Sequence, residues 1–135
     1  MNHGTTTVAE FRALLKAQRK PHKYGAKKTT VDGITFDSKR EAERYVELKA
    51  LQRYGQIEKL VMQPAFVLQE PFVRPNGQKV RAIKYVADFQ YIERKGLDRW
   101  FSVVEDVKGV ETPVFKLKRK LFWAEYPNTE LRIVK

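Results

Sequence analysis

Hydrophobic and polar positions along the chain predict a helix at its start. Apolar residues recur at helical spacing over residues 8–15, and a capping-box pattern with Thr7 as the N-cap marks the start of the helix. A basic stretch punctuated by proline and glycine follows over residues 20–28, which is typical of a loop or arm. We therefore predict a basic N-terminal helix and arm at 1–28, ahead of a main domain at 29–135.

The main domain begins with the pattern of a hairpin and then a helix. Two short β-prone runs flank Asp32-Gly33, which is a preferred two-residue turn of tight hairpins. Ser38 and Glu41 form a second capping-box pattern, and helical spacing continues to about residue 54, where a glycine follows. This region therefore predicts a hairpin over 29–36 and a long helix after it.

The rest of the chain alternates between strand patterns and one more helix. Strand patterns cover 57–68, interrupted or bent at Pro64, and then 79–93, 100–108 and 131–134. Thr112-Pro113 predicts the start of a helix that ends near residue 127. From the second helix onward the order is α-β-β-β-α-β. We therefore expect an α/β fold, with a mixed sheet flanked by helices.

Composition narrows the class of protein. The chain has 135 residues, of which 42% are hydrophobic, so one domain with a real core is expected. No apolar run approaches the ~20 residues of a membrane span, so we expect no membrane association. The absence of cysteine excludes disulfides and thiolate metal sites and suits a reducing compartment, so we expect a cytoplasmic protein.

The charge is strongly positive and unevenly distributed. The formal net charge is +11, and most of the basic excess lies in residues 1–30 and 113–135, while residues 31–112 are close to neutral. A charge this large favours a polyanionic partner, most often nucleic acid. A nucleic-acid-binding protein without activity would show this charge too, but the acids of the middle region also suit a metal-dependent enzyme.

Two neighbouring predicted strands carry acidic residues that are candidates for a catalytic or metal-binding site. Strand alternation places Asp106 and Lys108 on one face and Glu105 on the other. An Asp-x-Lys pair alone also occurs as a surface ion pair, which contributes little to stability. Asp88 lies mid-strand between Ala87 and Phe89, where a buried carboxylate needs a partner or a metal. A strand end or bulge would also account for Asp88.

A third acid and a set of basic residues complete the candidates. Glu41 projects toward the face of its helix that we expect to meet the sheet, although its place in the capping box also explains it. In the last helix, the predicted apolar face consists of Val114, Leu117, Leu121 and Ala124, with Phe115 and Phe122 at one edge. Lys118 falls within that stripe, whereas Trp123 lies among the outward residues Lys116, Arg119 and Lys120. The candidate nucleic-acid contacts are Lys20, Lys23, Lys27, Lys28, Lys116, Lys118, Arg119 and Lys120.

Carboxylates converging with a lysine suit phosphodiester hydrolysis. Carboxylate oxygens are ligands for Mg²⁺, and a lysine can orient the attacking water and offset charge in the transition state. Other chemistries fit less well, because the chain has no cysteine, only His3 and His22 as histidines, and no phosphate-binding glycine-rich motif.

The ordered set of motifs resembles the PD-(D/E)xK nuclease superfamily, and more closely a small phage-associated nuclease family within it. The segments that carry this resemblance are Phe36-Asp37-Ser38-Lys39-Arg40-Glu41-Ala42, Gln63-Pro64, Tyr85-Val86-Ala87-Asp88-Phe89 and Glu105-Asp106-Val107-Lys108-Gly109. The resemblance covers about residues 22–134 and implies a restriction-endonuclease-like core that cleaves DNA with Mg²⁺ or Mn²⁺. One departure is Ala87, where the superfamily name expects a proline.

By position, the resemblance implies that Asp88 and Asp106 are metal ligands, that Lys108 is the catalytic lysine and that Glu41 supports the metal. Glu105 is the alternative second acid. Small basic phage enzymes of this superfamily include Holliday-junction resolvases, which act as homodimers, so we expect a resolvase of phage recombination or replication in a bacterial host. A nicking or repair endonuclease of the same superfamily and a non-catalytic DNA-binding protein are the alternatives.

Overall fold

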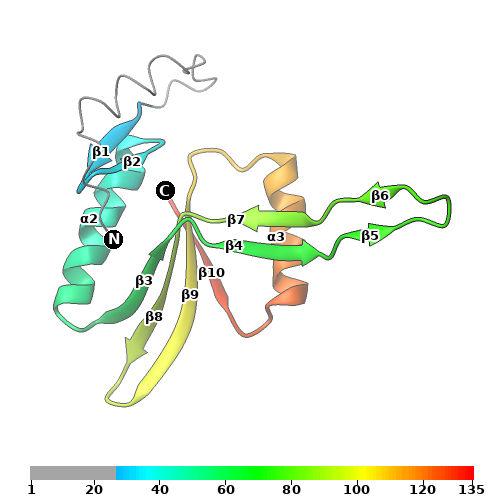
Figure 1. Ribbon diagram of the computed structural model, residues 1–135. Coiled ribbons are helices and arrows are strands. Elements are labelled where there is room, and N and C mark those ends of the chain that lie inside the picture. Colours follow the sequence, from blue (N-terminus) through cyan, green and yellow to red (C-terminus); the bar gives the residue numbers. More distant parts are fainter. Residues whose placement is uncertain (1–26) are drawn as a thin grey trace. The chain divides into compact units, whose positions relative to one another are not determined.

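The computed structural model describes residues 27–135 (Figure 1). The chain divides into two compact units within one helix: the first ends at Glu47 and the second is Leu48–Lys135. The helix and most of the arm predicted for residues 1–28, with Lys20 and Lys23, lie outside the described residues. No helix in the described part of the chain is both long and apolar enough to cross a lipid bilayer.

The first unit contains the predicted hairpin and the start of the predicted helix. Strands β1 (Thr29–Val31) and β2 (Ile34–Phe36) pair antiparallel around Asp32 and Gly33, whose φ angles of 52° and 75° are both left-handed. Helix α2 (Lys39–Arg53) follows, and the Ser38 hydroxyl accepts a hydrogen bond from the Glu41 N–H at 3.1 Å. Both predictions are confirmed.

The second unit contains a four-stranded mixed sheet in the order β10-β9-β8-β3. The strands are β3 (Ile57–Met62), β8 (Phe89–Lys95), β9 (Arg99–Val107) and β10 (Glu130–Val134). Strands β3, β8 and β9 pair antiparallel, whereas β10 runs parallel to β9 after a crossover through helix α3 (Pro113–Glu125). The expected α/β class with a mixed sheet is confirmed at this level.

Two antiparallel strand pairs extend from this sheet. Strands β4 (Ala65–Gln69) and β7 (Ile83–Val86) form one pair, and β5 (Phe72–Val73) and β6 (Lys79–Val80) form the other. The predicted interruption at Pro64 is confirmed, because β3 ends at Met62 and β4 begins at Ala65 in another sheet. The single strand predicted over 79–93 is wrong, because β6, β7 and β8 pair with different partners.

The change of partner at residues 87–88 matters for the site. The Ala87 N–H donates to the Pro64 carbonyl at 3.1 Å, whereas the Asp88 N–H donates to the Glu105 carbonyl at 3.1 Å. The chain therefore leaves one strand pair and joins the main sheet between these two residues. Periodicity in the sequence continues across this point, which is why it predicts one long strand with Asp88 inside it. Asp88 instead lies between β7 and β8, so the mid-strand position is wrong and the alternative of a strand end holds.

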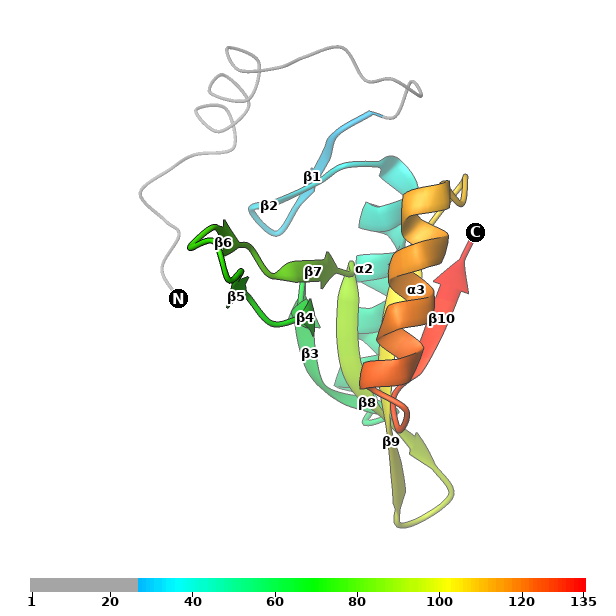
Figure 2. The same ribbon diagram turned by 90° about the vertical axis from the view of Figure 1, so that its right-hand side faces the viewer.

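Helix α3 covers one face of the second unit (Figure 2). The Thr112 hydroxyl caps its start by accepting a hydrogen bond from the Phe115 N–H at 3.1 Å, as the sequence predicts. Phe115 and Phe122 are buried, and they pack in one cluster with Leu68, Tyr85, Ala87 and Val104.

The apolar face predicted for α3 needs correction. Val114 and Leu117 are 62% and 60% exposed, because the helix turns its two phenylalanines inward instead. Aromatic side chains bury more apolar area than valine or leucine, so their positions determine the packed face. Lys118 is half-buried, and so is Arg119, which the sequence places on the outer face.

Candidate functional site

Asp106 and Lys108 lie near the end of β9, on the face that α3 covers. The Asp106 side chain is 3% exposed, and its Oδ2 accepts a hydrogen bond from the Tyr85 hydroxyl at 2.5 Å. The Lys108 Nζ lies 3.4 Å from Asp106 Oδ1 and 4.6 Å from the centre of the Phe115 ring. One carboxylate is thus held between a neutral donor and a cation.

Asp88 is held against the same end of β9. It is half-buried at the point where the chain joins the main sheet, and its Oδ2 accepts the Val107 N–H at 2.6 Å. Val107 lies between Asp106 and Lys108 in the sequence, so this hydrogen bond places the Asp88 carboxylate against the backbone that joins them. The second unit by itself therefore brings together Asp88, Asp106 and Lys108.

Tyr85 joins this group, and the sequence analysis did not select it. Burial raises the pKa of Tyr85 far above its ordinary value, and the hydrogen bond to Asp106 and the charges of Asp106 and Asp88 raise it further. The positive charge of Arg119 lowers this pKa, but by less. The hydroxyl therefore stays protonated and donates to Asp106. The available signal was the phenol itself, since a tyrosine predicted to be buried in a strand needs a polar partner.

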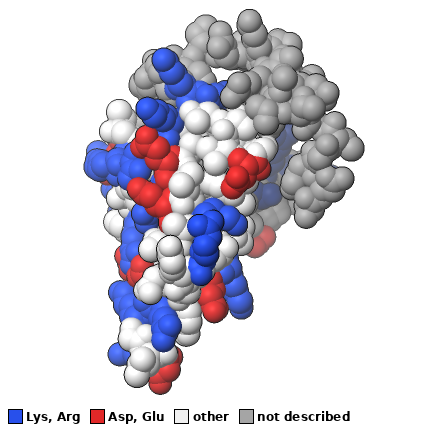
Figure 3. Space-filling view, turned by 90° about the vertical axis from the view of Figure 1, so that its left-hand side faces the viewer, with Lys and Arg blue, Asp and Glu red and all other residues white. Residues whose placement is uncertain are grey.

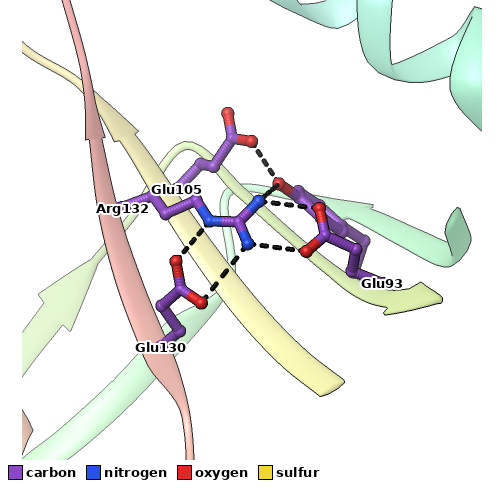
Figure 4. Close-up of polar contacts among 5 residues, drawn as sticks. Glu93, Glu105, Glu130 and Arg132 are labelled. Carbon is purple, nitrogen blue, oxygen red and sulfur yellow. Dashed lines mark hydrogen bonds and ion pairs between the residues drawn. The ribbon is translucent and has the colours of Figure 1, made fainter. Parts of the chain in front are cut away.

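Glu105 points to the opposite face of β9, as strand alternation predicts. It is fully buried, and the Tyr91 hydroxyl donates a hydrogen bond to its Oε2. Arg132 on β10 donates to that same Tyr91 hydroxyl at 3.4 Å, which links Glu105 to a network of charged groups (Figure 4). Glu105 and Asp106 are therefore neighbours in the sequence with separate surroundings.

Arg132 is the centre of that network. Its guanidinium donates to both oxygens of Glu93, at 2.6 and 2.8 Å, and also to Glu130. The hydrogen bonds to Glu93 and Glu130 raise the pKa of Arg132, and the hydrogen bond from Arg132 lowers the pKa of Glu130. An arginine thus balances the acids on this face, so a structural role accounts for them. The sequence analysis missed this network because Glu93 and Arg132 meet only through the sheet topology.

Glu41 belongs to the first unit. It lies in the first turn of α2, it is buried, and its N–H is capped by Ser38. The cap and the buried position that the sequence indicates are therefore both present. A supporting role of Glu41 for a metal stays a prediction.

The candidate nucleic-acid contacts fall into two groups. Lys27 and Lys28 precede β1 and are exposed, and Lys28 lies 3.4 Å from Asp37. On α3, Lys116 and Lys120 are exposed, as expected.

Arg119 on α3 differs from the other candidates. Its guanidinium forms an ion pair with Glu111 at 3.0 Å and lies over the rings of Phe115 and Trp123, at 5.2 and 5.3 Å. Trp123 is 52% exposed beside it, which leaves one aromatic surface open to solvent.

Asp88 and Asp106 are the carboxylates that could bind a metal ion in this group. No group of three or more histidine, cysteine or acidic side chains that could hold a metal occurs among residues 27–135. A site built on Asp88 and Asp106 would thus offer two carboxylates. Mg²⁺ is usually bound through one or two carboxylates, with water and substrate phosphate completing the shell, so this pair fits Mg²⁺ and does not resemble a zinc site.

Comparison with known proteins gives one match. A family model described as "Protein of unknown function (DUF1064)" matches residues 21–135. No curated protein and no solved structure matches the chain.

Proposed function

We propose that this chain, which belongs to the DUF1064 family, is a metal-dependent endonuclease that hydrolyses phosphodiester bonds in DNA. The observation that carries the proposal is the group of Asp88, Asp106 and Lys108, fixed at one end of β9 by the Val107 N–H and the Tyr85 hydroxyl. The resemblance of the ordered motifs to the PD-(D/E)xK superfamily supports the same reaction, and so does the net charge of +11.

Asp88 and Asp106 are the residues that would hold Mg²⁺, with Mn²⁺ as a substitute. When bound, such an ion polarises the scissile phosphate and lowers the pKa of a water. The Lys108 ammonium lies 3.4 Å from Asp106, where it can orient the attacking water and offset negative charge in the transition state. Tyr85 holds the Asp106 carboxylate in place, so it is a positioning residue.

We further propose that the substrate is branched DNA and that the enzyme acts as a homodimer, as a Holliday-junction resolvase does. The setting would be phage recombination or replication in the cytoplasm of a bacterial host. This finer proposal rests on the resemblance, on the small size of the chain and on its basic ends.

A panel of substrates tests both levels of the proposal. Labelled four-way junction, linear duplex and single-stranded DNA are incubated with the full-length protein in Mg²⁺, Mn²⁺ or EDTA. We expect cleavage with either metal, none with EDTA, and the fastest cleavage on the junction. Equal rates on junction and duplex would reject the resolvase and leave a nicking or repair nuclease.

Variants separate the reaction from DNA binding. Lys108→Ala should abolish most cleavage while DNA binding in EDTA is kept, whereas Lys49→Ala on α2 serves as the matched lysine control. Absence of cleavage by the wild type on every substrate with both metals would reject the enzyme and favour a DNA-binding protein without activity.

A further inference from the structure

The strand pair β5–β6 forms an arm in the second unit that the proposed reaction does not use. Residues 70–81, here called the ribbon arm, are exposed except for half-buried Val80 (Figure 1). In Figure 1 the arm continues the β4–β7 pair and projects from it, with its turn farthest from α3. A two-stranded hairpin without further packing is marginally stable in water. Because the ribbon arm is exposed, burial of its own side chains does not account for its length.

Hydrogen bonds within its turn define the tip of the ribbon arm. The Arg74 N–H donates to the Gln78 carbonyl at 2.8 Å, and the Gly77 N–H donates to the Arg74 carbonyl at 2.9 Å. The Asn76 side chain accepts the Gln78 N–H at 3.0 Å, and Gly77 adopts a φ of 87°, which favours glycine. The tip is therefore a defined turn.

The side chains of the ribbon arm combine positive charge with exposed apolar groups. Phe72 is 49% exposed and Val73 is 62% exposed. Residues 70–84 contain four basic residues and one acid, namely Arg74, Lys79, Arg81, Lys84 and Glu70. This charge is complementary to a polyanion.

The two faces of the ribbon arm follow from its register. Phe72 pairs with Val80 and Val73 pairs with Lys79, so alternation places Arg74 on the face of Phe72 and Lys79 on the face of Val73. The Arg74 guanidinium also donates to the Gln78 side chain at 2.6 Å. The face of Phe72 thus presents Arg74, and the face of Val73 presents Lys79 and, by the same alternation, Arg81.

We infer that the ribbon arm enters the major groove of duplex DNA. A two-stranded ribbon fits this groove, arginine and glutamine side chains pair with guanine and adenine edges, and apolar groups contact thymine methyls. The remaining basic residues of the arm face the phosphates. The inference rests on the proposed function for the choice of DNA, but it concerns binding and is tested without cleavage.

The test measures binding of full-length protein to labelled duplex DNA by fluorescence anisotropy, in EDTA and over a series of salt concentrations. Arg74→Ala/Lys79→Ala should raise Kd by about tenfold. It should also lower the slope of log K against log salt by about 0.9, since Lys79 faces a phosphate whereas Arg74 contacts a base edge. Lys49→Ala/Arg53→Ala, which removes the same charge from α2, should leave both values closer to wild type.

Phe72→Ala gives an independent readout, because it removes apolar contact without removing charge. It should raise Kd and leave the salt slope unchanged. The inference is overturned if the wild type does not bind duplex, if the two double variants bind alike, or if Phe72→Ala changes the oligomeric state while DNA binding stays constant. The last result would make the arm a contact between copies of the chain.

Since EDTA stops any metal-dependent cleavage, these outcomes do not depend on the nuclease proposal. An inactive protein whose arm variants lose binding would reject the nuclease and keep the inference. An active protein whose arm variants bind like the α2 control would keep the nuclease and reject the inference.

Discussion

At the scale of single residues, Asp106 has partners on two sides. The Tyr85 hydroxyl donates to one of its oxygens, and the Lys108 ammonium lies 3.4 Å from the other. Because the carboxylate is buried, these two partners replace contacts that water would otherwise make with its oxygens. The geometry of Asp106 therefore depends on Tyr85 as well as on its own strand.

Tyr85→Phe should slow cleavage while DNA binding is kept. Removing a hydrogen bond to a charged group costs about 1.5–3 kcal/mol, which corresponds to roughly a 10- to 150-fold loss of rate if it falls on the transition state. The measurement is the single-turnover cleavage rate, with Kd for DNA determined in EDTA. Tyr91→Phe is the matched control, since Tyr91 donates to Glu105 on the other face.

Stability should fall in alkali because of Tyr85. Its pKa is raised in the folded protein, so above the ordinary tyrosine value of about 10 the unfolded chain loses a proton that the folded chain keeps. The free energy of unfolding then decreases by up to about 1.4 kcal/mol per pH unit. Urea unfolding measured from about pH 9 to about pH 11, on either side of the ordinary tyrosine value, checks this decrease. Tyr85→Phe should flatten the decrease, and an equal decrease in both proteins would contradict the assignment.

Part of this site could be predicted from the sequence. Strand alternation separates Asp106 from Glu105, and the structure confirms that they point to opposite faces. The contacts of Tyr85 with Asp106 and of Arg132 with Glu93 could not be predicted in the same way, because these partners lie 21 and 39 positions apart in the chain. Such contacts depend on which strands pair, which local periodicity does not specify.

At the scale of elements, the break between β7 and β8 places Asp88. A mid-strand aspartate is unfavourable, but the chain changes partners here, and the Val107 N–H meets the carboxylate. The sequence predicts the hairpin, the caps and α2 correctly, because those are local signals. It fails for this break and for the packed face of α3, since both depend on tertiary contacts.

Thr112→Ala should destabilise the second unit through α3. The Thr112 hydroxyl accepts the Phe115 N–H at the start of the helix, and loss of such a cap costs about 0.5–2 kcal/mol. Urea unfolding measures the change in the free energy of unfolding. Thr129→Ala, in the turn before β10, is the control and should cost less; an equal cost would argue against the cap.

At the scale of the whole molecule, the positive charge is unevenly distributed over the described elements. Acidic and basic side chains are interspersed on the face shown in Figure 3, and α2 carries ion pairs of Arg40 and Arg44 with Glu47. The ribbon arm and α3 instead carry basic residues with few acids. These two elements of the second unit are therefore the described surfaces on which we expect DNA to bind.

The proposed homodimer has a specific candidate surface. Val114 and Leu117, which lie one turn apart on α3, are 62% and 60% exposed, and Val110 just before the helix is 59% exposed. Leu117→Glu should shift the protein toward monomer in sedimentation velocity, because a charge there is costly to bury. If wild type is already monomeric, or if the variant has an unchanged oligomeric state, this surface is not the dimer contact.

The central claim is that Asp106, and not its neighbour Glu105, takes part in hydrolysis. The most direct test is the rate of Mg²⁺-dependent DNA cleavage by Asp106→Asn compared with Glu105→Gln, both checked for folding by circular dichroism. Each variant removes one buried carboxylate from β9 with little change in shape. We predict that Asp106→Asn loses at least roughly a hundredfold in rate and that folded Glu105→Gln keeps most of its activity. Equal activity of the two variants, or greater loss in Glu105→Gln, would contradict the account.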